Sequence, residues 1–410
     1  MEFCPPRLGS DRRIFELLSR LSDRNNIHFV VFPPGRAFLG LIPFAHEHRK
    51  ENDNQLGNNL FAHYLAVPAF LQRKWTNSLF GYLSALLYLF PKALRKIRTI
   101  NPDIVIINYP SAYTGLCGFL VGRILGRKVV TEFNDIIAYY TVGLFGEQGS
   151  SKATRETILT GVLRSALVLV QNRIVERANM VTALTTYTMK YAELCGIRKA
   201  IHMIPDGVDT VLFDPESVSR SNVNRIRNKH GLKDDEKVIL YVGRLEKWAG
   251  VDLILKCAER LRHLKAKFLL VGEGNIELQT EMSNVVCCGK VPHEMVVNYL
   301  ALADVVLVPM GQDPLGQSAS PLKLFEAMAM GKPVIASNTQ GIRDVVNPQI
   351  NGVLLPFEET LWAETIAEII ENPAIAARLG KNARKTIESG YDWDILTGKF
   401  ERLLYQLVNS

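Results

Sequence analysis

Short apolar runs suited to β-strands alternate with longer helical stretches along most of this chain, and this alternation limits the fold more than any other feature. A strand that leads through a helix to another strand predicts a mostly parallel, doubly wound sheet with helices on both faces. The clearest strand candidates are 29–32, 103–108, 128–133, 238–242, 267–271, 285–288 and 305–308. The alternation is interrupted by a turn-rich segment at 201–215 and then restarts. We therefore expect an α/β protein with two Rossmann-like domains joined near residue 210.

The domain boundaries follow from the same pattern. We expect an N-terminal domain at 1–210, a second domain at 211–392, and an amphipathic helix within 393–410 that packs back on the first domain. The first residues read as a loop that enters a helix with almost no chain before it. Either the first strand is therefore missing or the true start lies upstream of Met1. Residues 36–75 show no clear period, and we expect them to be irregular.

Composition and cysteine use are typical of an intracellular globular protein. Of its residues, 47% are hydrophobic and 22% charged, and its six cysteines form neither a CxxC pair nor a zinc-type spacing. Residues 1–20 are charged and lack the apolar stretch of a signal peptide. The uncharged stretches at 75–91 and 104–122 are too short, too polar or too broken for a span of about 20 apolar residues. We expect a cytoplasmic protein that lies on a membrane at most.

Basic residues are concentrated in the first part of the chain. Of a net charge of +7, residues 1–150 supply most, with 17 Lys and Arg against 11 Asp and Glu. The basic 54–102 region has no acid and combines six Lys and Arg with eight aromatic residues. This mixture suits an anionic membrane surface or a phosphate-bearing lipid. Nucleic acid is the competing anion, but no binding-motif spacing supports it. A core helix with a basic solvent face is an equally good interpretation.

Several familiar site motifs are missing from the sequence. No GxGxxG follows the first strand, which leaves little support for dinucleotide binding, and no GxxxxGK[ST] is present, which argues against a P-loop NTPase. Neither GxSxG nor HExxH occurs, and no residue cluster indicates a metal site.

The segment 318–337 reads as a loop, a helix start, a short helix and a buried strand. We expect Ser320 to be the N-cap and Pro321 the first helical residue. The open N–H groups of such a helix start favour phosphate. Lys323 and Glu326 lie on the first turns, where the cation can meet phosphate and the carboxylate can accept hydrogen bonds from sugar hydroxyls. An ordinary capped helix is the alternative interpretation.

Two further loops follow strands of the second half, namely Gly243-Arg244 and Gly272-Glu273-Gly274. Ligands of open α/β sheets bind at the carboxyl ends of the strands. An arginine beside a helix N-terminus can clamp a diphosphate. We therefore expect these loops and the helix start after Ser320 to form one anion site.

Six motifs in order resemble glycosyltransferase family 4, over about residues 180–405. They are Met203–Asp209, Leu240–Leu245, Gly250–Asp252, Leu270–Gly274, Ala303–Pro309 and Ser320–Glu326. The N-terminal half resembles this family in layout only. The resemblance implies a GT-B fold with a cleft between the domains. It also implies a retaining transferase that moves a sugar from a nucleotide-diphosphate sugar to a glycan or polyprenyl- or lipid-linked acceptor, without a metal or other cofactor.

The resemblance also implies roles for single residues. Glu326 would bind the donor ribose, and Arg244 would stabilise the departing diphosphate, where negative charge grows in the transition state. The amides of Leu322 and Lys323 would face the distal phosphate. The remaining donor-binding candidates are the base-side pair Lys290 and Val291, the loop residues Gly243, Gly272, Glu273 and Ser320, and Gly9 and Ser10, which resemble a shortened N-domain glycine loop.

The chain departs from the family pattern in three places. Ser318 stands where the first of two acids is usual, which leaves sugar recognition open. Ala249 stands where the family usually has a second basic residue that binds phosphate, so we expect Lys247 or Lys323 to take that role. A catalytic histidine is often found where this chain has Asp135, which could position the acceptor, steady positive charge on the sugar, or cap a helix. The catalytic candidates are therefore Arg244, Lys247 and Asp135. A nucleotide-sugar epimerase or phosphorylase, or a non-catalytic nucleotide-sugar-binding protein, is the alternative function.

Overall fold

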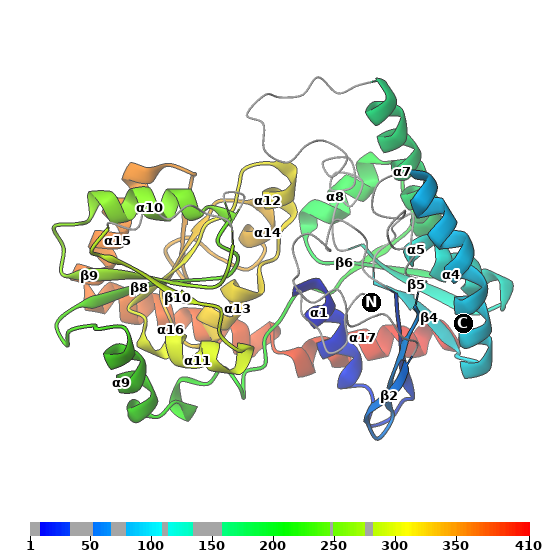
Figure 1. Cartoon of the computed structure of the whole chain (residues 1–410), viewed down its shortest axis with the longest axis horizontal. Coiled ribbons are helices and arrows are strands. Elements are labelled where there is room, and N and C mark those ends of the chain that lie inside the picture. The colour runs from blue at the N-terminus through cyan, green and yellow to red at the C-terminus, as the bar shows by residue number, and fades with distance from the viewer. Residues whose placement is uncertain are drawn as a thin grey trace. The chain divides into compact units, whose positions relative to one another are not determined.

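The computed structural model describes residues 9–32, 52–66, 79–108, 114–133, 158–246, 249–274 and 282–410. The chain divides into two units (Figure 1). The first unit combines early residues with the end of the sequence, as Met1–Leu184, Thr188–Ile204 and Thr397–Ser410. The second holds Thr185–Tyr187 and Pro205–Leu396.

A four-stranded parallel sheet with the order β4-β5-β6-β7 forms the centre of the first unit. Its strands are rich in β-branched residues, and every residue of β6 is buried, as expected for a strand covered on both faces. The strands are β4 (Ile104–Ile107), β5 (Lys128–Phe133), β6 (Met180–Ala183) and β7 (Ile201–Met203). The helices around them are α4 (Leu79–Ile100), α5 (Thr114–Ile124), α7 (Ile158–Arg177) and α8 (Thr186–Leu194).

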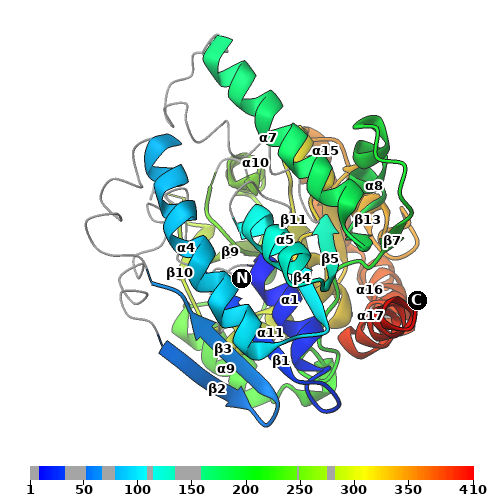
Figure 2. The same cartoon turned by 90° about the vertical axis from the view of Figure 1, so that its right-hand side faces the viewer.

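A second, three-stranded sheet of this unit has the order β1-β3-β2 (Figure 2). Strand β1 (Ile27–Val31) is parallel to β3 (Leu60–Tyr64), and β2 (Asn52–Gly57) pairs antiparallel with β3. The prediction that residues 36–75 are irregular is therefore wrong for this hairpin. The reason is that β2 is an exposed edge strand of mostly polar residues, so it lacks the alternation that marks a half-buried strand.

Helix α1 (Gly9–Ser19) is tied to the four-stranded sheet by a buried arginine. The Arg13 guanidinium donates to a carboxylate oxygen of Glu132 on β5 at 3.2 Å and to the carbonyl of Ile204 at 2.7 Å. Both charged side chains are almost completely excluded from solvent. Each therefore depends on the other, because a buried charge without a partner is strongly destabilising.

The second unit is built on a six-stranded parallel sheet with the order β10-β9-β8-β11-β12-β13. Successive residues of β8 point to opposite faces: Val238 and Leu240 belong to one core, and Ile239 and Tyr241 to the other. The predicted doubly wound sheet is confirmed here. The strands are β8 (Lys237–Val242), β9 (Ala266–Val271), β10 (Val285–Gly289), β11 (Val305–Val308), β12 (Val334–Ser337) and β13 (Val353–Leu355).

Helices cover both faces of this sheet. Helices α10 and α15 pack in the core around Trp362, which is fully buried, while α11 and α13 pack in the core around Phe325 on the opposite face. The helices of the unit are α9 (Arg220–Lys229), α10 (Val251–Arg260), α11 (His293–Leu302), α12 (Pro314–Ser318), α13 (Leu322–Ala329), α14 (Gln340–Arg343), α15 (Glu359–Glu371) and α16 (Pro373–Gly390).

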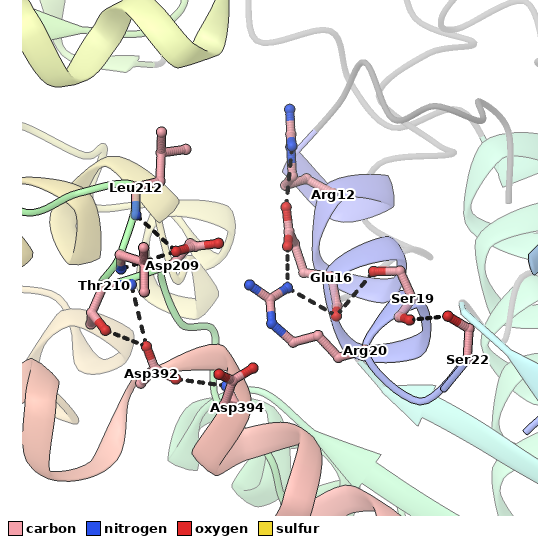
Figure 3. A network of polar contacts seen from close by, with 11 residues as sticks. Arg12, Glu16, Ser19, Arg20, Ser22, Asp209, Thr210, Leu212, Asp392 and Asp394 are labelled. Atoms are coloured by element: carbon pink, nitrogen blue, oxygen red, sulfur yellow. Dashed lines mark hydrogen bonds and ion pairs between the residues drawn. The ribbon is translucent and has the colours of Figure 1, made fainter. Parts of the chain in front are cut away.

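Two chain segments that connect the units are hydrogen-bonded to each other. The amide of Val208 donates to the carbonyl of Tyr391 at 3.0 Å, and the amide of Trp393 donates to the carbonyl of Val208 at 3.1 Å. The carboxylate of Asp392 accepts from the amide and hydroxyl of Thr210, at 3.2 and 2.6 Å (Figure 3). Helix α17 (Trp393–Val408) starts here and continues into the first unit.

Candidate functional site

Three glycine-containing loops lie next to one another at the carboxyl edge of the six-stranded sheet. The amide of Gly243, just after β8, donates to the carbonyl of Val271 at 2.9 Å, and the amide of Leu245 donates to the carbonyl of Glu273, also at 2.9 Å. The amide of Gly272 donates to the carbonyl of Gly289 at 2.9 Å, at the end of β10. The loops around 243 and 272 that the sequence singles out are therefore direct neighbours.

This close approach depends on two glycines. Gly243 has a φ of 145° and Gly272 a φ of 149°, which residues with a side chain rarely adopt. A Cβ atom on Gly272 would lie 1.8 Å from the carbonyl oxygen of Gly243, which is far inside van der Waals contact. The loops after β8 and β9 can therefore approach each other this closely only because residue 272 has no side chain.

Helix α13 begins at the same end of the sheet. Its N-cap is Pro321, with φ −75° and ψ 120°, and no side chain caps it. The prediction that Ser320 is the cap and Pro321 the first helical residue is wrong by one position, because Pro321 has the extended backbone of a capping residue. Within the described part of the chain, the amides of Leu322 and Lys323 have no hydrogen-bond partner. The first turn of α13 therefore presents free donors.

Lys323 places its amine beside the Gly243 turn. Its Nζ lies 4.1 Å from the centre of the Tyr241 ring, and a Cβ on Gly243 would be only 2.9 Å from that nitrogen. The Tyr241 hydroxyl donates to the carbonyl of Arg244 at 2.7 Å, which links the aromatic ring to the same turn. Burial lowers the pKa of Lys323 to about 7, and the carboxylate of Glu326 offsets only part of this effect. An anion at this place would raise that pKa again.

Arg244 is half-buried and is held by a neighbour that sequence reasoning missed. Its Nη2 donates to a carboxylate oxygen of Glu246 at 3.2 Å. A guanidinium has five N–H donors, so one ion pair leaves several for a ligand. The Arg-x-Glu spacing was the available signal, but it is too common to indicate a pair by itself.

Glu326 lies on α13, is nearly buried, and accepts a hydrogen bond from His293 at the start of α11. The distance from His293 Nε2 to Glu326 Oε1 is 2.8 Å. Sequence reasoning missed His293. Its only signal was its place at the start of a helix that follows the strand at 285–289.

The other predicted site residues have different surroundings. Lys290 is exposed and pairs with Glu273 at 2.9 Å, so these two join the loops after β10 and β9. Gly9 and Ser10 are the first two residues of α1 in the first unit. Lys247 and Asp135 lie outside the described residues, so their roles stay predictions. Among the described residues, no group of three or more His, Cys, Asp and Glu could hold a metal ion.

Two family models match the chain one after the other. The model of glycosyltransferase family 4 matches residues 9–212, and the model of group 1 glycosyl transferases matches residues 222–386. The chain belongs to glycosyltransferase family 4. The resemblance inferred from the ordered motifs is therefore confirmed.

The curated relatives of this chain differ in how much of their length is matched. The N-acetyl-alpha-D-glucosaminyl L-malate synthase of Bacillus anthracis is 22% identical, with 99% of this chain and 96% of the relative aligned. The GDP-mannose-dependent monoacylated alpha-(1-6)-phosphatidylinositol monomannoside mannosyltransferase of Corynebacterium glutamicum is 27% identical over 55% of this chain and 62% of its own. Two other curated relatives are matched over 54% and 48% of their length.

Solved structures agree with the fold that the family implies. The structure of Anabaena Alr3699/HepE in complex with UDP-glucose has a TM-score of 0.68 and 19% identity, covering 98% of this chain and 97% of that one. A likeness at this identity establishes the fold alone. The predicted GT-B fold of this family 4 chain is thereby confirmed.

Proposed function

We propose that this chain is a retaining glycosyltransferase that moves a sugar from a nucleotide-diphosphate sugar to a glycan or lipid-linked acceptor. The observation that carries the proposal is that a lysine amine, the turn that bears Arg244 and free helix amides come together at one sheet edge. Lys323 lies against the Gly243-Arg244 turn, and the uncapped start of α13 is adjacent in sequence. Such a set of donors matches a diphosphate in charge and in hydrogen bonding.

In this proposal, Arg244 and Lys323 neutralise the diphosphate as it leaves the sugar. Negative charge on the departing group grows in the transition state, so these cations lower the barrier more than they strengthen ground-state binding. Lys323 then takes the part of the second phosphate cation, because its amine already lies beside the Gly243 turn. The two side chains would supply positive charge without a metal. Glu326 would bind the donor ribose, and Asp135 would act on the acceptor side.

We propose that the anomeric configuration is retained because of the family membership of the chain, and the configuration of the product tests this. The anomeric configuration of the sugar before and after transfer can be read from proton NMR coupling constants. An inverted product would contradict a retaining mechanism. Incubation with donor alone separates transfer from the epimerase alternative, because an epimerase changes the sugar without an acceptor. Donor binding without turnover across an acceptor panel would favour a non-catalytic role.

The donor can be identified by thermal unfolding with UDP-, GDP- and ADP-sugars. We expect one base to stabilise the protein, since a ligand at about 100 times its Kd adds roughly 2.7 kcal/mol. That corresponds to a Tm increase of roughly 5–10 °C for a unit of this size. A Lys323→Met variant should lose most of this increase while its own Tm without ligand is unchanged or higher, because a desolvated amine has been removed.

The result that would contradict the donor site is specific. If no nucleotide sugar shifts the Tm of the unaltered protein, the proposed donor class is wrong. If one does, and Lys323→Met responds equally, Lys323 is not the second phosphate cation. Lys265→Met is a matched control, because this exposed lysine on the same unit pairs only with Asp235 in the described structure.

We also propose that the acceptor side of the protein meets an anionic membrane surface. Helix α5 packs against both α4 and α7 (Figure 2). The three helices carry exposed apolar and basic side chains. The exposed apolar residues are Leu87, Leu120, Ile124 and Leu169, and the exposed basic residues include Arg95, Arg98, Arg123 and Arg173. No helix in the described residues is long and apolar enough to cross a membrane. The proposed contact is therefore a surface contact.

This surface differs from the one that the 54–102 region suggested. Lys96 is not free, because it pairs with Asp53 at 2.8 Å. Tyr88 and Phe90 are partly buried and pack against the core of the first unit. Arg95 and Arg98 remain exposed, and Arg123 on α5 extends the surface beyond the 54–102 region.

Sedimentation with vesicles of phosphatidylglycerol and phosphatidylcholine tests the membrane contact. Changing Arg95, Arg98 and Arg123 to Gln should weaken binding by roughly 100-fold, at about 1 kcal/mol per basic residue. Changing Lys256, Arg262 and Lys265 of the second unit removes the same charge and should have little effect. Binding by the first variant equal to that of the unaltered protein would contradict the proposed surface.

A further inference from the structure

The carboxylate of Glu326 has a partner that the donor-binding assignment does not explain. His293 comes from a different helix, 33 residues earlier in the chain, and its Nε2 lies 2.8 Å from Glu326 Oε1. Glu326 is 8% exposed, so this carboxylate is largely removed from water. Within the described part of the chain, no other side chain hydrogen-bonds to it, and Oε2 accepts no hydrogen bond.

We infer that His293 is a positioning residue: it donates Nε2–H to Glu326 Oε1 and so orients Oε2 toward a ribose hydroxyl of the nucleotide. This inference rests on the proposed function, since it assumes that Glu326 binds the donor ribose. His293 itself has no contact with the reacting atoms in this arrangement. It acts through the carboxylate alone.

The reason that a carboxylate needs such help is torsional. The last torsion of a glutamate side chain has a broad energy profile, so an unrestrained carboxylate samples many orientations. A hydrogen bond to one oxygen selects a single plane for the group. The other oxygen is then held in place before the ligand arrives, which reduces the ordering cost of binding.

The histidine ring is itself fixed by packing. Phe213 lies edge-on to the ring of His293, with the ring centres 5.4 Å apart and an angle of 65° between the planes. Phe213 is fully buried in the core that α11 and α13 share. The ring therefore cannot follow the carboxylate freely, and the direction of the hydrogen bond is set by the fold.

This pair differs from the ion pairs on the surface of the same unit. Arg260 and Glu359, for example, are 2.7 Å apart, but their side chains are 49% and 32% exposed to water. Such exposed pairs contribute little to the free energy of unfolding, because water can replace either partner. Because Glu326 is buried, little water can reach its carboxylate and take the place of His293. Loss of the histidine therefore leaves a buried acceptor without its donor.

The effect should fall on nucleotide binding and not on the chemical step. A contact that is equally strong in the ground state and the transition state changes KM and leaves kcat alone. We expect His293→Leu to raise the donor KM and the Kd of the matching nucleoside diphosphate by about 10-fold. His293→Gln should restore most of the affinity, because its amide nitrogen can donate from a similar place.

The decisive experiment compares the nucleotide with its deoxy forms. Calorimetric Kd values would be measured for UDP, GDP and ADP, and for the 2′-deoxy and 3′-deoxy forms of the one that binds, on the unaltered protein, His293→Leu and His293→Gln. The unaltered protein should lose more affinity than His293→Leu when one hydroxyl is removed. This unequal loss would show that His293 positions the Glu326 carboxylate, because general damage to the site would weaken the binding of all forms of the nucleotide by the same factor.

The outcomes separate the inference from the proposed function. If the unaltered protein binds none of the three nucleotides, the proposed function fails and the inference fails with it. If it binds one, and His293→Leu either keeps that affinity or loses the same factor for the deoxy forms, only the inference is overturned. Should His293→Leu not fold, His293→Ala replaces it in the same comparison: a smaller loss on hydroxyl removal than in the unaltered protein supports the inference, and an equal loss overturns it.

Discussion

Replacing Arg244 by alanine is expected to lower kcat by about a hundred-fold or more, the loss that follows removal of one charge partner of a transition state. Arg244 stands directly after the Gly243 turn, and its guanidinium is half-buried and paired with Glu246. The substitution should leave the fold intact, because both partners keep some access to water. Turnover of the donor identified by thermal unfolding, measured at saturating donor, checks this result.

The matched variants for this prediction lie close by. Arg244→Lys keeps a positive charge but loses the planar fork, so we expect intermediate turnover. Arg262→Ala removes an exposed arginine of the same unit and should leave kcat unchanged. Near-normal turnover by Arg244→Ala with every donor would contradict the assignment of this residue to the leaving diphosphate.

Replacing Gly272 by alanine is expected to destabilise the second unit severely. The new Cβ would lie 1.8 Å from the Gly243 carbonyl oxygen, and that oxygen belongs to the backbone, so no side-chain movement can relieve the clash. The φ of 149° adds strain of its own. We expect Gly272→Ala to be one of the rare substitutions that lower the free energy of unfolding by more than about 4 kcal/mol. This corresponds to a Tm decrease of roughly 10 °C or more.

Thermal unfolding of Gly272→Ala beside Gly390→Ala tests this expectation. Gly390 ends α16 with no atom within 4 Å of a new Cβ, so its replacement should change the free energy of unfolding by about 1 kcal/mol at most. If Gly272→Ala unfolds at the temperature of the unaltered protein, the close approach of the two loops is not needed for folding.

The sequence predicted the second unit best because its strands are short apolar runs between helices. Strands β8, β9, β11 and β12 are buried on both faces, which leaves a clear signal in the sequence. The hairpin at Asn52–Tyr64 left no such signal, because its edge strand is polar and exposed. A local sequence pattern reflects which residues are buried, so it does not reveal an element that has few buried residues.

The sequence predicted the charged residues of the site but not the partners to which they are hydrogen-bonded. Arg244, Lys323 and Glu326 stand in recognisable motifs, whereas His293 and Glu246 are ordinary residues until the fold brings them to their partners. Glu326 and His293 are 33 residues apart, and no local pattern connects them. The start of α13 was misplaced by one residue because proline suits both the cap and the first helical position. Asp135 and Lys247 stay predictions.

The first unit includes a segment that the ribosome makes last of all its parts. Residues Thr397–Ser410 belong to it, and Lys399 donates to the carbonyl of Met203 at 2.9 Å, beside the end of β7. All of the second unit from Pro205 to Leu396 is therefore synthesised before the first can be completed. During translation, the second unit can therefore fold before the last segment of the first unit has been made.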